Sequence, residues 1–478
     1  MKPGQTALAL ASSIIVGCAA VKPATAPAML NAVPLAGTTL PSGGQWPESH
    51  WWQRYQDPTL NQLVETALAD SPTLAAAHAR FDSARESVRV TAAAVGAHVD
   101  ASAQLARQRL SDNGLFSPER LMINNWYNQA DLGLAASYTF DWWGKQRASV
   151  EAATSEAHAA AAERNAAALV LSGAVVDTYF GWQADQARLA LVQQRVDALA
   201  QVAAIDGARY RAELDSADEQ ARSNGDLAAA RQQQASLAGS AQLRLVALAA
   251  LTGHAVAQLP QLDAKPLPQL PSALPEGVGM DLLARRPDIA ASRARVEAAQ
   301  RRRHVAAAQF YPDISLHALA GLQSIELGKL LQAGSANPQI GIAIHLPLFD
   351  NGQRTAQLKI ADSEINAAIA TYNETIIGAA REVASDVVAG EQAASERTQQ
   401  LAQIDSASHF EQSAAARVRQ GITDLRPQLS AQYALLLQRD ALVQLDAAAL
   451  SADIALQRAL GGGFEDSPVN NPKLTYTP

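Results

Sequence analysis

Phe140-Asp141-Trp142-Trp143-Gly144-Lys145-Gln146-Arg147 is a stretch of sequence that recurs, loosely, as Phe349-Asp350-Asn351-Gly352-Gln353-Arg354. Each copy follows a segment in which apolar residues alternate with small or polar ones. Each copy also precedes a long stretch rich in Ala, Gln and Leu. Alternation is typical of a strand, and the long stretch is typical of a helix. The repeat therefore predicts a strand-to-helix junction that the chain uses twice.

The composition favours closely packed helices. The chain has 478 residues, of which 48% are hydrophobic but only 5% are aromatic. Much of the apolar content is alanine, which favours helix strongly but buries little surface, so we expect helices that pack side by side rather than around a bulky core. The formal net charge is -8 and no block of like charges stands out. Nucleic acid is therefore not an expected partner.

The first residues are typical of a secretory signal. A short basic start is followed by an apolar run over residues 7–16 and by small residues before Cys18, the single cysteine. This pattern resembles a bacterial lipobox, which predicts a signal peptide over 1–17, lipidation of Cys18 and a tether over 18–45. Ala19 favours delivery to the outer membrane by the same resemblance. The alternative is an ordinary signal peptide that contains a cysteine.

Four segments alternate with a period of two residues, which predicts four strands. They cover about 98–111, 130–141, 314–325 and 338–350. Each has the length of a tilted transmembrane β-strand, and the strands come in pairs. Two hairpins of a soluble sandwich are the alternative. The residues that share an apolar face are Val99, Ala101, Ala103 and Leu105; Leu132, Leu134, Ala136, Tyr138 and Phe140; Ile314, Leu316, Ala318 and Ala320; and Ile340, Ile342, Ile344, Leu346 and Leu348.

Long helices are predicted over 145–255 and 352–460. Apolar residues from Leu189 to Ala203 step by three and four, as in a coiled-coil seam. We expect a break near Asp206-Gly207 or at Glu213–Asp215, which gives two helices of roughly sixty and forty residues, the longer reaching roughly 90 Å. No later stretch has the ~18 consecutive apolar residues of a membrane-spanning helix.

These elements divide the chain into two structural repeats, 46–265 and 266–464, followed by a C-terminal tail over 465–478. One chain offers four strands, and unpaired strand edges cannot face lipid. Closed membrane barrels start at about eight strands, whereas three chains would supply about twelve. The sequence therefore predicts an α+β membrane protein. Its trimeric 12-stranded antiparallel β-barrel, with four strands per chain, continues into a long α-helical coiled-coil tunnel.

Several motifs in order resemble the outer-membrane factor family of tripartite efflux systems. This is the TolC/OprM-like, NodT-type group, and the chain is similar to its multidrug and fusaric-acid-resistance outer membrane lipoproteins. The resemblance covers nearly everything after the tether. The matching stretches are Leu282-Leu283-Ala284-Arg285-Arg286-Pro287-Asp288-Ile289, Ala306-Ala307-Ala308-Gln309-Phe310-Tyr311-Pro312-Asp313-Ile314, Leu346-Pro347-Leu348-Phe349-Asp350-Asn351-Gly352, Trp46-Pro47 with Trp51-Trp52, Asp177-Thr178-Tyr179-Phe180-Gly181-Trp182-Gln183-Ala184, and Ala459-Leu460-Gly461-Gly462-Gly463-Phe464.

The resemblance implies a homotrimeric channel in the outer membrane with a tunnel in the periplasm. Such a channel docks on a periplasmic adaptor that couples it to an inner-membrane pump, and it passively conducts drugs or other small toxic compounds. Two alternatives stay open: a type I-like polypeptide export channel, and a structural coiled-coil lipoprotein or adaptor without a pore. No catalytic constellation, cofactor motif or metal-ligand spacing is present in the sequence, so an enzyme is not expected.

By the same resemblance, the gate lies at the periplasmic tips where helix pairs turn. The candidates for a gate or constriction are the charged residues of the two tips, Asp215, Asp218, Glu219, Arg419, Asp424 and Arg426. The alternative is that these are solvated helix-end charges. The chain departs from the family pattern at Glu213, where glycine is usual, and at Pro427 and Ser430, where an acidic residue is usual.

Three further features have structural interpretations. Asp288 precedes a helix and favours its positive end. The run from Arg301 to His304 is expected to be a solvated helix face. Trp142 and Trp143 suit either an interfacial belt or a packing role at the junction.

Overall fold

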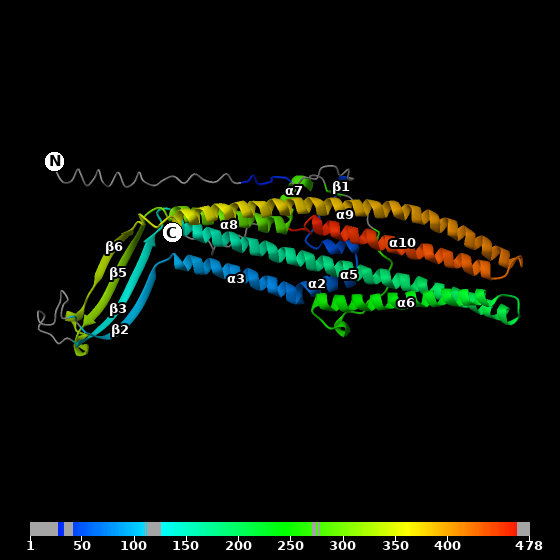
Figure 1. Ribbon diagram of the computed structural model, residues 1–478, viewed down its shortest axis with the longest axis horizontal. Helices are drawn as coiled ribbons and strands as arrows, with labels where there is room; N and C mark the ends of the chain where they lie inside the picture. Colours follow the sequence, from blue (N-terminus) through cyan, green and yellow to red (C-terminus); the bar gives the residue numbers. More distant parts are fainter. Residues whose placement is uncertain are drawn as a thin grey trace.

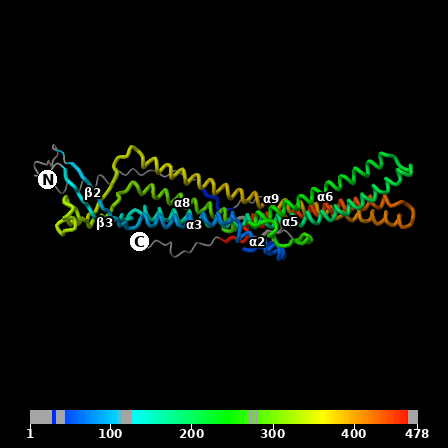
Figure 2. The backbone as a smooth tube through the Cα atoms, turned by 90° about the horizontal axis from the view of Figure 1, so that it is seen from below, coloured from blue at the N-terminus to red at the C-terminus, as the bar shows by residue number. Residues whose placement is uncertain are grey.

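The computed structural model describes residues 27–32, 42–109, 111, 126–269, 274–275 and 278–465. The signal peptide, Cys18, most of the tether and the tail beyond residue 465 lie outside these residues. The molecule is a long rod with a curved sheet at one end and two helical turns at the other (Figure 1). A view turned by 90° shows the same separation between the sheet and the turns (Figure 2).

The four-stranded sheet has the order β2-β3-β5-β6 and is antiparallel throughout. Its strands are β2 (His98–Arg109), β3 (Trp126–Phe140), β5 (Asp313–Ser324) and β6 (Gln339–His345). Nearly all residues of β2 and all of β6 are exposed within one chain. Both strands are edges of the sheet, so the sheet is incomplete until other strands pair with them.

The register confirms the predicted apolar face. Ile340 pairs with Ala318, Ala318 with Ala136, and Ala136 with Val99, so one row of apolar side chains crosses all four strands. The last strand is shorter than predicted and ends at His345, so Leu346 and Leu348 are not part of it. Pro347 accounts for the early end, because proline has no N–H to donate to a ladder.

Four long helices form the rest of the rod. They are α5 (Lys145–Arg211), α6 (Ala217–Thr252), α9 (Gln353–Arg419) and α10 (Arg426–Ala459). Helices α5 and α9 have 67 residues each, which corresponds to about 100 Å. The break between α5 and α6 lies at 212–216, so the predicted alternative at Asp206-Gly207 is wrong. A glycine in a helix interior costs only about 1 kcal/mol, and helix packing overrides that cost.

The remaining elements pack along the long helices or beside the sheet (Figure 1). Asp57 caps α2 (Pro58–Asp70) by accepting a hydrogen bond from the Thr59 amide at 3.0 Å, and Pro58 follows it at the first helical position. The other elements are α3 (Pro72–Ala94), α7 (Val278–Arg285), α8 (Pro287–Ala308), the parallel pair β1 (Ser42–Gly44) and β4 (Leu274–Pro275), and the 3-10 turns Trp51–Tyr55, Val256–Gln258, Leu327–Lys329 and Ala333–Ser335.

The repeated Phe-Asp motif is the junction between strand and long helix in both halves. The Asp141 carboxylate accepts hydrogen bonds from the amides of Gln146 and Arg147, at 2.9 and 2.8 Å. In the second copy, the Asp350 carboxylate accepts from the amides of Gly352 and Arg354, both at 3.1 Å. The carboxylate satisfies amides that have no partner in the first turn of each helix. One acidic residue therefore starts each 67-residue helix.

The arginine run on α8 is largely exposed, as predicted, and its side chains also pair with the neighbouring helices. Arg301 pairs with Glu151 and Arg302 with Glu156, both on α5. Arg303 pairs with Asp362 on α9, with 2.6 Å between Nε and Oδ1. Successive side chains on a helix point in different directions, so one run of three arginines reaches both neighbouring helices. The sequence pattern alone did not show that α8 lies between α5 and α9.

Helices α5 and α6 each contain an 18-residue window, of mean hydropathy 1.2 and 1.3, that satisfies the requirements for a membrane span by length and composition. Both windows are rich in alanine, and both helices pack against others of the rod: α5 against α6, α8 and α10, and α6 against α5. Of these windows, 39% is buried in α5 and 28% in α6.

The main core lies at the middle of the rod, around Trp51, Tyr179 and Ile454. The three glycines that follow α10 close this core. Gly461 has a φ of +93°, and a Cβ added to it would lie 1.9 Å from the Arg285 carbonyl oxygen. The chain end of α10 thus contacts the turn between α7 and α8 directly, at a distance that only glycine permits.

We expect Gly461→Ala to lower the free energy of unfolding by about 2–4 kcal/mol, because the new methyl group clashes with backbone and the positive φ is strained. Chemical denaturation monitored by circular dichroism measures this change. Gly225→Ala on α6 is the matched control: no heavy atom lies within 4 Å of its added Cβ. The control should be neutral or stabilising by up to about 1 kcal/mol. Equal effects of the two substitutions would contradict the packing role of Gly461.

Candidate functional site

The two helical turns at the end of the rod have the same backbone structure. At the first turn, the Leu214 amide bonds the Arg209 carbonyl and the Glu213 amide bonds that of Tyr210. The second turn repeats this pattern with Ile422, Arg417, Gly421 and Val418. Both are Schellman motifs, which place one residue in the left-handed region. These residues are Glu213, with a φ of 59°, and Gly421, with a φ of 70°.

This geometry explains the departure at Glu213. The left-handed region is the reason that glycine is usual at this position, and a residue with a side chain accepts it at a cost of ~1 kcal/mol. Pro427 causes no such strain, because it lies in the first turn of α10, where no backbone hydrogen bond is lost. Both departures are compatible with helical turns at these places.

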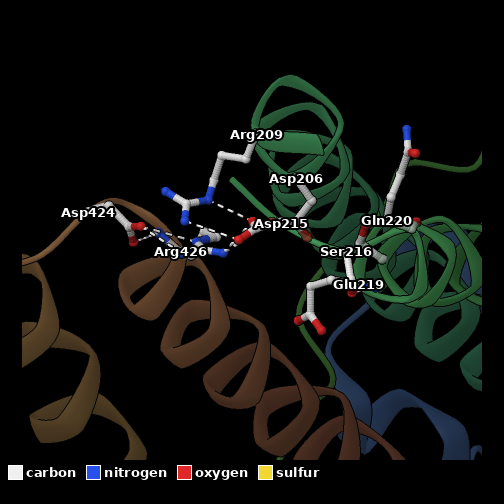
Figure 3. Close-up of polar contacts among 9 residues, drawn as sticks. Asp206, Arg209, Asp215, Ser216, Glu219, Gln220, Asp424 and Arg426 are labelled. Carbon is white, nitrogen blue, oxygen red and sulfur yellow. Dashed lines mark hydrogen bonds and ion pairs between the residues drawn. The ribbon is translucent and has the colours of Figure 1, made fainter. Parts of the chain in front are cut away.

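Five charged residues from both turns form one cluster, named the tip cluster below: Asp206, Arg209, Asp215, Asp424 and Arg426 (Figure 3). Arg426 Nη2 lies 3.0 Å from Asp424 Oδ2. Its Nη1 lies 3.2 Å from Asp215 Oδ2 and 3.5 Å from Asp206 Oδ1, both on the other helix pair. Arg426 therefore joins the α9–α10 turn to the α5–α6 turn.

Arg209 completes the cluster from the end of α5. Its Nε and Nη2 lie 2.6 and 3.1 Å from the two carboxylate oxygens of Asp215, a two-point contact that fixes the geometry of both groups. Asp215 is thus held between two guanidinium groups. The Asp206 carboxylate lies deepest, since only 3% of the residue is exposed.

The structure brings together three of the predicted tip residues, Asp215, Asp424 and Arg426. It leaves the other three apart: Asp218 and Glu219 lie in the first turn of α6, and Arg419 in the last turn of α9. All three are exposed, and none makes an ion pair with another residue of the described chain. The two carboxylates lie at the positive N-terminal end of α6 and the guanidinium group at the negative C-terminal end of α9, so each charge is favourable for its helix.

The site prediction omitted Asp206 and Arg209. The signal for Asp206 is present in the sequence, because the seam residues Leu199 and Ala203 continue to Asp206 with the same spacing of four and three. A carboxylate at a seam position faces the neighbouring helix, and there it requires a partner. Another ion pair joins α5 to α10, where Arg188 Nε lies 2.8 Å from Asp440 Oδ1.

Contacts with arginine shift the pKa values of two carboxyl groups in the tip cluster. The Arg209 hydrogen bonds hold the pKa of Asp215 below its usual value, and the Arg426 contacts do the same for the pKa of Asp424. In turn, Asp215 raises the pKa of Arg209, and Asp424 raises that of Arg426. The ion pairs are therefore fully formed near neutral pH.

Two other sequence features have structural roles. Trp143 packs at the junction: its Nε1 donates to the Pro312 carbonyl at 2.8 Å, and its ring stacks on Tyr311. The Asp288 carboxylate binds the buried Arg286 at 2.6 Å, and Arg286 also reaches Glu382 on α9 and the Ala459 carbonyl at the end of α10. Arg286 thereby joins three helices, which agrees with the structural interpretation of this motif.

The outer membrane efflux protein family matches residues 63–254 and 278–462, which are the two halves of the rod. The chain belongs to this family. The multidrug resistance outer membrane protein MdtQ of Escherichia coli O157:H7 is 33% identical over 465 residues, with 95% of this chain and 96% of the relative aligned. MdtP of Escherichia coli K12 is 30% identical over 471 residues, 97% of this chain and 96% of that protein.

Solved structures agree with this family assignment. The outer membrane protein VceC from Vibrio cholerae has a TM-score of 0.79 and 34% identity, covering 88% of this chain and all of that one. The outer-membrane channel OprN has a TM-score of 0.82 and 26% identity, covering 92% and 98%. This outer membrane efflux protein is accordingly a channel of the outer membrane. The predicted fold, a trimeric 12-stranded barrel with a helical tunnel, is confirmed.

The lowered pKa values of Asp215 and Asp424 determine the pH range over which their ion pairs in the tip cluster are formed. Its ion pairs stabilise the turns above about pH 4 and are lost only as pH falls through the lowered values. Amide hydrogen exchange at 211–216 and 421–426, corrected for intrinsic rates, should show constant protection between about pH 7 and 5. The Asp215→Asn/Asp424→Asn variant should lose protection throughout, and Asp218→Asn should not. Loosening of the wild-type turns in that range would contradict this assignment.

Proposed function

We propose that this outer membrane efflux protein conducts drugs or other small toxic compounds, which an inner-membrane pump delivers through a periplasmic adaptor. The names of its relatives support this cargo, since MdtQ and MdtP are multidrug resistance outer membrane proteins. The chain supplies the passive part of the process, a conduit with a gate. Energy comes from the pump, so the work of this protein is to hold the tunnel shut or open.

The position of Arg426 supports a gate at the tips. Each helix pair ends in a turn, and the Arg426 contacts with Asp206 and Asp215 connect the two turns of one chain. A tunnel that widens at its end must move helix pairs relative to one another. Such a movement separates Arg426 from carboxylates on the other pair, so these contacts favour the closed arrangement. We assign Asp215, Asp424 and Arg426 to the gate on this basis.

The balance of charge in the tip cluster explains how the contacts can break without unfolding the turns. Each cluster has three carboxylates and two guanidinium groups, so three chains give the tunnel end an excess of negative charge. Carboxylates around a constriction repel one another and select among permeating ions. The arginines offset this repulsion while the gate is closed. An incoming partner that competes for them would release the repulsion and favour opening.

We expect Arg426→Ala to raise the conductance of the purified trimer in planar bilayers several-fold, because the variant leaves three carboxylates near a single guanidinium group. Asp218→Ala is the matched control: it removes a tip charge that belongs to no ion pair in the described chain, and its conductance should equal that of the wild type. Equal conductance of all three proteins would remove the tip cluster from the gate. A monomer without conductance in mild detergent would refute the channel proposal itself.

We also propose that Cys18 carries the lipid anchor. The described part of the N-terminal segment is fastened to the outside of α9 by Asn373, whose Oδ1 accepts from the Leu30 amide at 2.9 Å and whose Nδ2 donates to the Ala28 carbonyl at 3.0 Å. Asn373 lies twenty residues from the start of α9 at Gln353, so the clip is about 30 Å from the barrel end. Ten residues of extended chain span about the same distance, which allows Cys18 to reach the membrane.

Mass spectrometry of the N-terminal peptide from membranes should show Cys18 as the first residue with attached acyl chains. Cys18→Ser should lose this modification and still form trimers, because the barrel and the helices supply the assembly contacts. An unmodified Cys18 within a longer peptide would instead support an ordinary signal peptide.

A further inference from the structure

The inner face of the barrel carries histidines that the proposed gate does not use. The register places one face of the sheet outward, since it carries rows of apolar residues such as Ile340, Ala318, Ala136 and Val99. The opposite face therefore lines the lumen, as in other membrane barrels. His98, His317 and His345 all lie on this face and are exposed within the chain.

Two of these histidines lie in one row across the sheet. His98 pairs with Ser137, Ser137 with His317, and His317 with Gly341. His345 pairs with Asp313 four residues closer to the helices, which is about 13 Å along the strand. Three chains therefore place two belts of imidazoles around the base of the lumen, and each side chain repeats three times.

The charged groups that face these belts are few. Asp100 lies on the same face as His98, two residues further along β2, and Asp131 lies on the same face of β3. Asp313 faces His345 but is paired with Lys145 at the start of α5, with 2.9 Å between Nζ and Oδ2. Among the described strand residues no Lys or Arg faces the lumen. Arg107 lies on the outer face, where its guanidinium stacks over Trp126.

We propose that these residues make the barrel lumen a pH-dependent charge filter, an inference that rests on the proposed channel function. Near neutral pH, the unpaired carboxylates of Asp100 and Asp131 favour cationic and neutral compounds over anions. Histidine is the side chain that gains charge between about pH 8 and 5. On the described strands, three imidazoles per chain outnumber the two carboxylates that form no ion pair, so protonation reverses the sign of this face and favours anions.

One contact fixes the ring of His98. Its Nδ1 lies 3.0 Å from the Gly96 carbonyl oxygen, which can only accept a hydrogen bond. The neutral ring therefore holds its proton on Nδ1.

The test is the ratio of potassium to chloride permeability, from reversal potentials of the purified trimer in a salt gradient. The ratio should exceed one at about pH 7.5 and fall to one or below at about pH 5. Asp215 and Asp424 of the tip cluster stay ionised over this range, because contacts with Arg209 and Arg426 hold their pKa values below the usual range. Comparing one protein at two pH values therefore cancels the constant charge of these two groups.

Two sets of variants separate the contribution of the histidines from that of the carboxylates. The triple variant His98→Gln/His317→Gln/His345→Gln should keep its cation preference at both pH values, and His409→Gln on the exposed face of α9 should respond to pH like the wild type. Asp100→Asn/Asp131→Asn should have a weaker cation preference than the wild type at about pH 7.5, because the tip cluster keeps its own excess of carboxylates, and should still shift toward anions at about pH 5. A conducting wild type with the same permeability ratio at both pH values, or a triple variant that still shifts, would overturn the filter. A protein without any conductance would overturn the channel proposal itself.

Discussion

The unpaired edges of a four-stranded sheet are the constraint from which the rest of this molecule follows. Strands β2 and β6 each present a row of backbone donors and acceptors with no partner in the described part of the chain, and a membrane offers none. Only closure with other copies satisfies them, and three copies of four strands give the twelve-stranded ring of the family fold. Once the barrel is threefold, the helices that continue its strands must form a threefold tube, and every charged group becomes part of a ring.

The duplicated aspartate links this barrel to the tube. Asp141 and Asp350 bind the first amides of α5 and α9, which gives two helices of 67 residues that begin at the same level. Because their lengths are equal, both turns end at the same depth, and Arg426 can reach across to Asp206 and Asp215. A strand-to-helix junction at one end of the rod therefore determines which side chains meet at the other end, about 100 Å away.

The sequence allowed the fold to be predicted further than the site. Alternating segments and the repeated Phe-Asp motif are local signals, and they located the four strands and the starts of the two long helices. Strand β6 ends at His345 because Pro347 follows it. Helix α5 continues through Gly207 to Arg211 because helix packing outweighs the cost of a glycine. The tip cluster is different, because it joins residues more than two hundred positions apart. Charge type could not separate Asp215 from Asp218; only the direction of each side chain toward the neighbouring helix pair does so.

All the contacts of the tip cluster described here join residues of a single chain. A trimer repeats this connection once in each chain. Under the proposed gate, a single substitution at Arg426 therefore changes three contacts around the tunnel end at the same time.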